Sequence, residues 1–394
     1  MRFSDARECV IREVRRSRLP LPPETVELSH APDRVLAQEI AADRDYPPVD
    51  RSVRDGYALQ SASTPGRLAV IGEVRAGESF PGEVGPGQAV EIMTGAPIPR
   101  GADAVVMIEH TQPDGDWVEV PQPVPTGEAI HARAAESRSG QILLAPGRRL
   151  GYAEIALLAS AGCETIQVYR RPRVAILATG DEIVEVGEKP LPHQVRNSNS
   201  AALAVQVTRA GGIPVVLPVA RDNYPSTRER IAQGLENDLL LLSGGVSAGK
   251  YDIVEKVLAE AGAVFFFDRV LIQPGQPLVF GRARDRFFFG LPGNPASTML
   301  TFEAFARAAV ELLGGAGETP LPMPWARLTS AFRQKPGLVR FLPALLSDDG
   351  AEVTPVPWKG SSDIGALTRA NAFLVTEQDR EQWNAGEPIR VLPK

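Results

Sequence analysis

The sequence predicts a multidomain protein of the α/β plus β class, in which a doubly wound, mostly parallel α/β domain is joined to smaller β-rich parts. The chain has 394 residues, which corresponds to roughly two to four domains at about 150 residues each. Apolar runs that end in Gly, Pro or Asp alternate with helical patterns between residues 171 and 317, a pattern typical of parallel sheets. Short β-branched runs separated by Gly and Pro occupy residues 44–124 and 318–394.

Composition excludes several classes of protein. Lys and Arg number 42 and Asp and Glu 48, a net charge of −6 that argues against a nucleic-acid partner. The two cysteines, Cys9 and Cys163, and four scattered histidines favour neither a disulfide framework nor a zinc site. No apolar run approaches the roughly 20 residues that a membrane helix needs, and the first residues lack the apolar core of a secretory signal. We therefore expect a cytoplasmic protein that does not contact membranes.

The first third of the chain contains a helix followed by an inserted β unit. Ala6, Val10 and Val14 are spaced four apart before Pro20, which predicts an amphipathic helix. Strands are predicted over 68–74, 89–93, 104–108 and 117–120, and helical periodicity returns at 152–161. We therefore predict a discontinuous, mixed α/β linker domain (domain I, 1–43 and 125–170) that is interrupted by a β-rich inserted domain (domain II, 44–124).

The remaining residues form an α/β domain and a β domain. The α/β domain (domain III) is predicted over 171–317 and a small C-terminal β domain (domain IV) over 318–394, where Asp349-Gly350 marks a turn. Ligands of doubly wound sheets bind outside the carboxyl ends of the strands. We therefore expect the loops 179–182, 221–223, 243–252 and 291–298 to meet in one crevice.

A glycine-rich turn, SGGVSAGKYD, follows one predicted strand. Residues Gly244 to Lys250 match the first part of a nucleotide phosphate loop, but Tyr251 stands where such a loop needs Ser or Thr for magnesium, which argues against an ATPase or GTPase. Glycines and a following helix N-terminus still favour an anionic ligand. The alternative is a plain strand-to-helix turn.

Four acidic residues lie in the expected crevice: Asp181, Glu182, Asp222 and Asp252. Carboxylates beside an anion-binding turn repel the ligand unless a hard cation lies between them, and Mg²⁺ shared with phosphate oxygens is the usual solution. The group therefore predicts a phosphorylated substrate. Taken singly, Asp252 could cap its helix and Asp222 could close a turn.

Two proline-containing turns supply further candidate ligand contacts. LPGNPAS contains Pro292 and Pro295, which fix φ, and Gly293, which tolerates positive φ. QPGQP (273–277) carries amides on both flanks, with Arg269 four residues upstream. These groups could donate to oxyanion oxygens, or the second turn could be a solvent-facing hairpin.

Eight segments together resemble the molybdopterin molybdenumtransferase family, which comprises the bacterial MoeA proteins and the gephyrin E domain. They are PPVDRSVRDGYA, GEVRAGE, MTGAPIPRGADAVV, ATGDEI, RNSNSAAL, LLLSGGVSAGKYD, PGQP and GLPGNPAS. The resemblance implies an elongated homodimer of four-domain subunits with a small C-terminal β-barrel-like domain. In each subunit, a MogA-like domain III would hold the pterin, and domain II of the partner would close the site.

The resemblance also implies the reaction and its residues. Molybdate would react with adenylylated molybdopterin, with Mg²⁺ present, to give molybdenum cofactor and AMP. The implied catalytic residues are Asp55 and Thr94 from the partner subunit and Glu182, Asp222 and Asp252, of which the last three would also bind Mg²⁺. The implied substrate-binding residues are Ser243, Gly244, Gly245, Ser247, Pro292, Asn294 and Pro295. To these we add Gly180 and Asp181 of the first turn, and Arg269 and Gln273 as candidate donors to oxyanions.

This chain departs from the family pattern at two places. Many relatives have lysines where this chain has Gln273 and Gln276, and basic residues in a PGRxxF segment where PGLVRF keeps only Arg340. Two other functions stay open: a molybdopterin adenylyltransferase, and a pterin-binding scaffold without turnover. Candidate partners are the molybdopterin adenylyltransferase that would supply the substrate and the apo-forms of molybdoenzymes that would receive the product.

Overall fold

The structure is a computed structural model that describes residues 1–17, 20–244 and 253–394. It divides into two compact units, which are described separately. The first consists of residues 1–37, 146–152 and 165–394, and the second of residues 38–145 and 153–164. Among the described residues, none of the helices has the length and apolar character required to cross a bilayer.

The first unit contains a six-stranded α/β sheet with the strand order β16-β13-β17-β21-β20-β18. Strands β16, β13, β17 and β21 pair in parallel, and β20 and β18 continue the sheet antiparallel. The prediction of a doubly wound, mostly parallel sheet is therefore confirmed. The strands are β13 (Arg173–Ala178), β16 (Ile213–Val216), β17 (Leu239–Ser243), β18 (Val264–Phe267), β20 (Val279–Ala283) and β21 (Arg286–Leu291).

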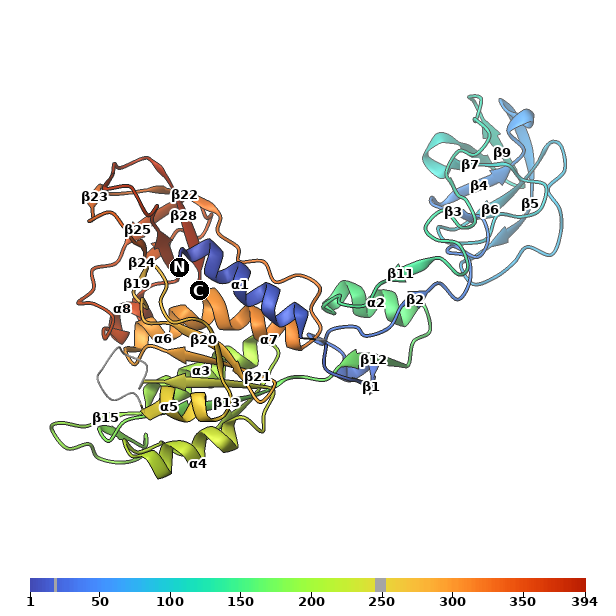
Figure 1. Cartoon of the computed structure of the whole chain (residues 1–394). Coiled ribbons are helices and arrows are strands. Elements are labelled where there is room, and N and C mark those ends of the chain that lie inside the picture. Colours follow the sequence, from blue (N-terminus) through green and yellow to red (C-terminus); the bar gives the residue numbers. More distant parts are fainter. Residues whose placement is uncertain (18–19, 245–252) are drawn as a thin grey trace. The chain divides into compact units, whose positions relative to one another are not determined.

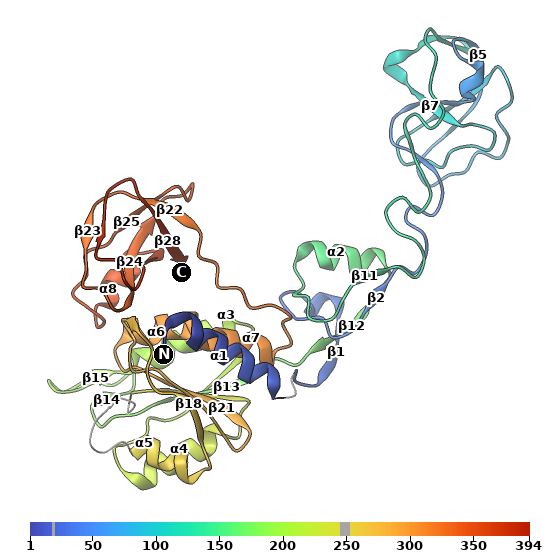
Figure 2. The same cartoon turned by 45° about the horizontal axis from the view of Figure 1, so that its top comes forward.

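Helices cover both faces of this sheet because its central strands are apolar on both sides. Leu239 and Leu241 of β17 belong to one core cluster, and Leu240 and Leu242 to the other. Figures 1 and 2 show α4 and α5 on the face opposite to α1 and α7. The helices are α3 (Ser198–Arg209), α4 (Tyr224–Gly234), α5 (Ile253–Glu260), α6 (Pro295–Thr301), the π-helical turn η4 (Phe302–Ala306) and α7 (Arg307–Leu313).

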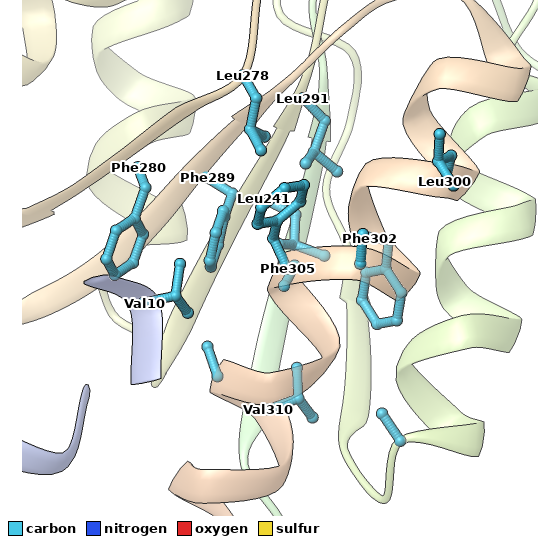
Figure 3. Close-up of a cluster of buried hydrophobic side chains, with 14 of the residues drawn as sticks. Val10, Leu241, Leu278, Phe280, Phe289, Leu291, Leu300, Phe302, Phe305 and Val310 are labelled. Atoms are coloured by element: carbon cyan, nitrogen blue, oxygen red, sulfur yellow. The ribbon is translucent and has the colours of Figure 1, made fainter. Parts of the chain in front are cut away.

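The N-terminal helix α1 (Phe3–Arg16) packs in the core of the α/β unit. Val10 points into the cluster that contains Phe280 and Phe289 (Figure 3). The ring of Phe3 makes edge contacts with Phe305 and Phe341, at centroid distances of 5.5 and 5.4 Å. The sequence analysis places this helix in domain I, and in the structure its apolar side packs against the helices that flank the α/β sheet.

The C-terminal residues form a closed five-stranded barrel, as the β-barrel-like prediction requires. Pairings β24–β25, β25–β22, β22–β28, β28–β26 and β26–β24 close the ring, and β19 (Ile272–Gln273) of the α/β region adds to β24. The barrel strands are β22 (Trp325–Leu328), β24 (Val339–Leu346), β25 (Glu352–Pro355), β26 (Ala372–Val375) and β28 (Pro388–Pro393), with β23 (Phe332–Arg333), β27 (Gln382–Trp383) and α8 (Ile364–Arg369) beside them.

Three nested antiparallel pairings connect the α/β unit to the inserted β sheet along the chain. These are β1 (Pro23–Glu27) with β12 (Thr165–Tyr169), β2 (Ile40–Ala41) with β11 (Ile142–Leu144), and β3 (Arg51–Ser52) with β10 (Ile130–His131). The chain therefore leaves and returns through paired strands, as expected of an insertion. The four-domain boundaries themselves stay a prediction.

The second unit is built on a six-stranded sheet with the order β7-β4-β6-β5-β9-β8. Successive residues of β4, such as Tyr57 and Ala58, point to opposite faces of the sheet and belong to separate core clusters. All four strands that the sequence predicts here are present. The elements are β4 (Gly56–Leu59), β5 (Gly66–Val74), β6 (Gln88–Ile92), β7 (Ala104–Met107), β8 (Gln112–Asp114), β9 (Trp117–Val120) and the helix α2 (Tyr152–Ser160).

Candidate active site

The turns after the parallel strands meet at the carboxyl edge of the α/β sheet, as predicted. The Thr179 N–H donates to the Ser243 carbonyl over 3.1 Å, which joins the turns after β13 and β17. The Gly244 N–H donates to the carbonyl of Leu291, the last residue of β21, over 3.3 Å. The Gly180 N–H donates to the Ala220 carbonyl over 3.1 Å. Turns that are far apart in sequence are therefore joined to one another at this edge.

Two described glycines of these turns lie close to neighbouring atoms and leave little room for a side chain. Gly244 has φ +90°, and a Cβ there would lie 2.9 Å from the Thr179 carbonyl oxygen. Gly180 has φ +137°, and a Cβ there would lie 2.5 Å from the Glu182 carboxylate. Both N–H groups donate to backbone carbonyls, and the contact of these two glycines with substrate stays a prediction. Gly245 and Ser247 lie outside the described residues.

Asp181 and Asp222 are joined by two hydrogen bonds between neighbouring turns. The Asp222 N–H donates to Asp181 Oδ1 over 3.1 Å, and the Asp181 N–H donates to Asp222 Oδ2 over 3.4 Å. Both side chains are exposed, as is Glu182. The second oxygen of each aspartate faces no hydrogen-bond donor among the described residues. Asp252 lies outside these residues, within which no group of three or more His, Cys, Asp and Glu side chains is placed to hold a metal ion.

An amide that sequence analysis did not select connects two of these turns. Asn199, in the first turn of α3, donates through Nδ2 to Ser243 Oγ and to the Gly293 carbonyl, both over 2.8 Å. Pro292 is buried, and Asn294 and Pro295 begin α6, so these three residues line the turn beside Gly293. The signal for Asn199 is a short polar residue at a helix start that faces the carboxyl edge of the sheet.

The QPGQP turn forms a second polar group, between the α/β region and the barrel. Gln273 pairs with Arg340 in the β19–β24 ladder, and the Arg340 guanidinium donates to Gln273 Oε1. Gly275 has φ +101°, and a Cβ there would lie 2.5 Å from Thr301 Cγ2 of α6. The turn is therefore packed on α6 and is no free hairpin. Arg269 is exposed, and its carbonyl accepts from the N-terminal amino group over 2.9 Å.

The pair Asp55 and Thr94 is assembled in the second unit. The Thr94 backbone N–H donates to Asp55 Oδ1 over 2.6 Å, and the Thr94 hydroxyl donates to the same oxygen over 2.7 Å. The backbone bond is the larger cause and the hydroxyl bond the smaller one of a lowered pKa at Asp55. The carboxylate is therefore held ionised on the surface of the β unit.

Three parts of the chain match models of known protein families. Residues 175–311, which contain the acidic and glycine turns, match the family model described as "Probable molybdopterin binding domain". Residues 1–162 match "MoeA N-terminal region (domain I and II)", and residues 325–394 match "MoeA C-terminal region (domain IV)". The class is thus a protein with a molybdopterin-binding type of α/β domain, flanked by two regions of the MoeA type.

The chain belongs to the molybdopterin molybdenumtransferase family. The enzyme of that name from Bacillus subtilis is 34% identical over 386 residues, which cover 94% of this chain and 89% of the relative. The one from Haemophilus influenzae is 32% identical, with 95% of each chain covered. Two crystal structures of the molybdopterin biosynthesis MoeA protein from Pyrococcus horikoshii are also similar. One has a TM-score of 0.78 at 30% identity over 100% of this chain and 98% of that chain, and the other 0.83 at 26% identity over 100% of both.

Proposed function

We propose that this protein inserts molybdenum into adenylylated molybdopterin, with molybdate as the second substrate, and releases molybdenum cofactor and AMP. The observation that carries this function is the match to enzymes named molybdopterin molybdenumtransferase over 94% of the chain. The convergence of the acidic, glycine and proline turns at one sheet edge supports it. The alternative hypothesis, a molybdopterin adenylyltransferase, is based on the α/β domain alone, whereas the molybdenumtransferases are similar over 94–95% of the chain.

The site must bring together a molybdate dianion and a phosphoanhydride, which repel each other. Arg340, held against Gln273, and the hydroxyl of Ser243 are candidate groups to stabilise these oxygens, with Arg269 as a further cation. Preorganised donors of this kind commonly lower the barrier by about 2.7–4 kcal/mol each. In our proposal the turn at Pro292, Asn294 and Pro295 forms the opposite wall of the pterin site.

Magnesium is the proposed cation of the site. The exposed carboxylates of Glu182 and Asp222, with Asp252 of the GKYD segment, have the hard oxygen ligands that Mg²⁺ prefers. The free oxygens of Asp181 and Asp222 fit such a role, because their other oxygens are already bonded to backbone N–H groups. When bound, Mg²⁺ would neutralise phosphate oxygens of the substrate. Activity should disappear with EDTA and return with added Mg²⁺.

Asp55 and Thr94 are proposed to act on the site of a second copy of this chain in a homodimer. Support comes from the family resemblance, which implies a homodimer in which domain II of the partner closes the site. The adenylyltransferase and the apo-molybdoenzymes stay proposed partners, and a cytoplasmic location stays a prediction.

The test is AMP release by the purified protein. With adenylylated molybdopterin, AMP should appear only when molybdate is added. ATP and molybdopterin without molybdate should give no adenylylated pterin, and its accumulation would favour the adenylyltransferase. Binding of adenylylated molybdopterin with no AMP release in the presence of molybdate and Mg²⁺ would favour the scaffold.

A further inference from the structure

Asn199 uses both N–H groups of its side-chain amide to connect the turns that end two neighbouring strands. One goes to Ser243 Oγ at the end of β17, and the other to the Gly293 carbonyl beyond β21, each over 2.8 Å. A carbonyl oxygen only accepts hydrogen bonds, so the amide nitrogen rather than the oxygen must face Gly293. The orientation of the amide is therefore determined by its surroundings.

The helix that carries this amide is held firmly in place. The side chain of Asn197 caps α3 by accepting from the Ser200 N–H over 3.1 Å. Leu203 and Val207 of the same helix are fully buried in the core between α3 and the sheet. A side chain in the first turn of such a helix is positioned precisely enough to set the geometry of a site.

The amide also determines where the Ser243 hydroxyl can donate. Because Asn199 donates to Ser243 Oγ, the hydroxyl hydrogen must point to another acceptor. Ser243 is only 4% exposed, and its hydroxyl donates no hydrogen bond to the described residues. Buried polar groups are normally satisfied, so this hydroxyl hydrogen is available to an acceptor on a ligand.

Two further polar atoms nearby have no partner. Thr179 Oγ1 and Asn199 Oδ1 are buried without a hydrogen bond, and Thr179 Oγ1 would lie 3.3 Å from a Cβ at Gly244. A Cβ at Gly293 would in turn lie 3.6 Å from Gly244 Cα. The unpartnered atoms thus surround the point where the turns of β13, β17 and β21 meet.

We propose that Asn199 is a positioning residue that aims the Ser243 hydroxyl at an anionic oxygen of the substrate and ties it to the Gly293 turn. The proposal rests on the function proposed above and adds the residue that orients this donor. Removing Asn199 frees the Ser243 hydroxyl to rotate, and the hydroxyl loses its fixed direction. Binding of the anionic substrate is the property expected to suffer.

The test compares Asn199→Ala, Ser243→Ala and the double variant in molybdate-dependent AMP release. Loss of one hydrogen bond to a charged group is expected to raise KM for adenylylated molybdopterin about tenfold or more, with kcat changed less than about threefold. The double variant should be no worse than Ser243→Ala, because Asn199 acts through that hydroxyl. Single-variant effects that multiply, or a KM within about twofold of wild type for Asn199→Ala, would overturn the proposal.

A charged variant, Asn199→Asp, provides a second test, because a purely structural role of Asn199 would not make KM depend on pH. In Asn199→Asp the ionised carboxylate repels the Gly293 carbonyl and the anionic substrate, whereas the protonated form donates one hydrogen bond. The ratio of the KM of Asn199→Asp for adenylylated molybdopterin to that of wild type should therefore fall as the pH falls from 8 to 5.5. The same ratio for Asn199→Ala should not change. A flat ratio for Asn199→Asp would count against the proposal.

The matched control is Asn237→Ala, because Asn237 also donates through Nδ2 to two carbonyls, those of Gln233 and Gly234, at 3.2 and 3.3 Å. It lies before the start of β17, whereas Ser243 lies at its end. This control should lower Tm and leave KM unchanged. If wild type itself releases no AMP, the proposed function fails; if wild type is active and Asn199→Ala matches it, only the role of Asn199 fails.

Discussion

Asp55 accepts both hydrogen bonds from Thr94 on a single oxygen, Oδ1. The pair joins the turn before β4 to the turn after β6, two neighbouring strands of the inserted sheet. Because both donors come from one residue, the carboxylate is fixed in direction, and Oδ2 accepts no hydrogen bond from the part of the chain that the structure describes. A surface carboxylate that is held in this manner is prepared to face a ligand or a second protein surface.

Thr94→Val should raise the pKa of Asp55 towards its ordinary value, although the backbone N–H bond keeps it partly lowered. A carboxyl whose folded pKa is depressed contributes stability above the unfolded value, about 3.9, and loses it as the pH falls through the folded pKa. The variant should therefore be less stable than wild type at pH 6, with a smaller difference at pH 3. Carboxyl NMR titration and urea unfolding at both pH values measure this.

Thr111→Val is the control, since the Thr111 hydroxyl donates to the Ile108 carbonyl rather than to a carboxylate. Its effect on stability should not depend on pH between 3 and 6. An unchanged Asp55 titration in Thr94→Val would show that the hydroxyl bond does not contribute to the lowered pKa.

Mixed dimers test whether Asp55 acts on the partner's site. Asp55→Ala and Asp222→Ala should each be inactive alone. When the two are co-expressed and mix randomly, about half of the dimers are heterodimers, and each has one intact site, so roughly a quarter of wild-type AMP release should return. The control mixture, Asp222→Ala with Glu182→Ala, should stay inactive because both changes affect the same α/β domain. No recovery in the first mixture would place Asp55 and Asp222 in the site of one chain.

The strands of the sheet could be predicted, but several contacts that shape the site could not. Leu239 to Leu242 form an apolar run long enough for a buried strand, and Gly and Asp after such runs indicate turns at the carboxyl edge. The turn order then suffices to bring Asp181 near Asp222. Local patterns do not determine which distant surface an apolar stripe will cover. For this reason neither the packing of α1 beside the α/β sheet nor the contact between Gln273 and Arg340 could be predicted from the sequence.

Gly244→Ala should be more destabilising than an alanine at an ordinary left-handed glycine. A non-glycine residue with positive φ costs about 1–2 kcal/mol, and the new Cβ would also meet the Thr179 carbonyl oxygen at 2.9 Å. Gly262→Ala is the matched control, because Gly262 has φ +78° with nothing within 4 Å of a Cβ. Urea unfolding should give a loss of about 1–2 kcal/mol for the control and a larger one for Gly244→Ala. AMP release should fall only in Gly244→Ala, and equal losses in both would argue against a close approach of the two turns.

Gln273→Lys should replace the hydrogen bond between Arg340 and a neutral amide with a pair of cations, whose stability depends on a bound anion. Arg340 donates to Gln273 Oε1, so a lysine there places two cations side by side, and their repulsion lowers stability most at low salt. Molybdate bound between them would relieve the repulsion, so it should raise Tm more in the variant than in wild type.

Gln382→Lys is the control, since Gln382 Oε1 accepts from Arg333 Nη2 over 2.8 Å in the barrel. Thermal unfolding with molybdate, and with sodium chloride at equal ionic strength, measures the difference. If molybdate and chloride raise the Tm of Gln273→Lys equally, the QPGQP turn and Arg340 do not form an oxyanion site.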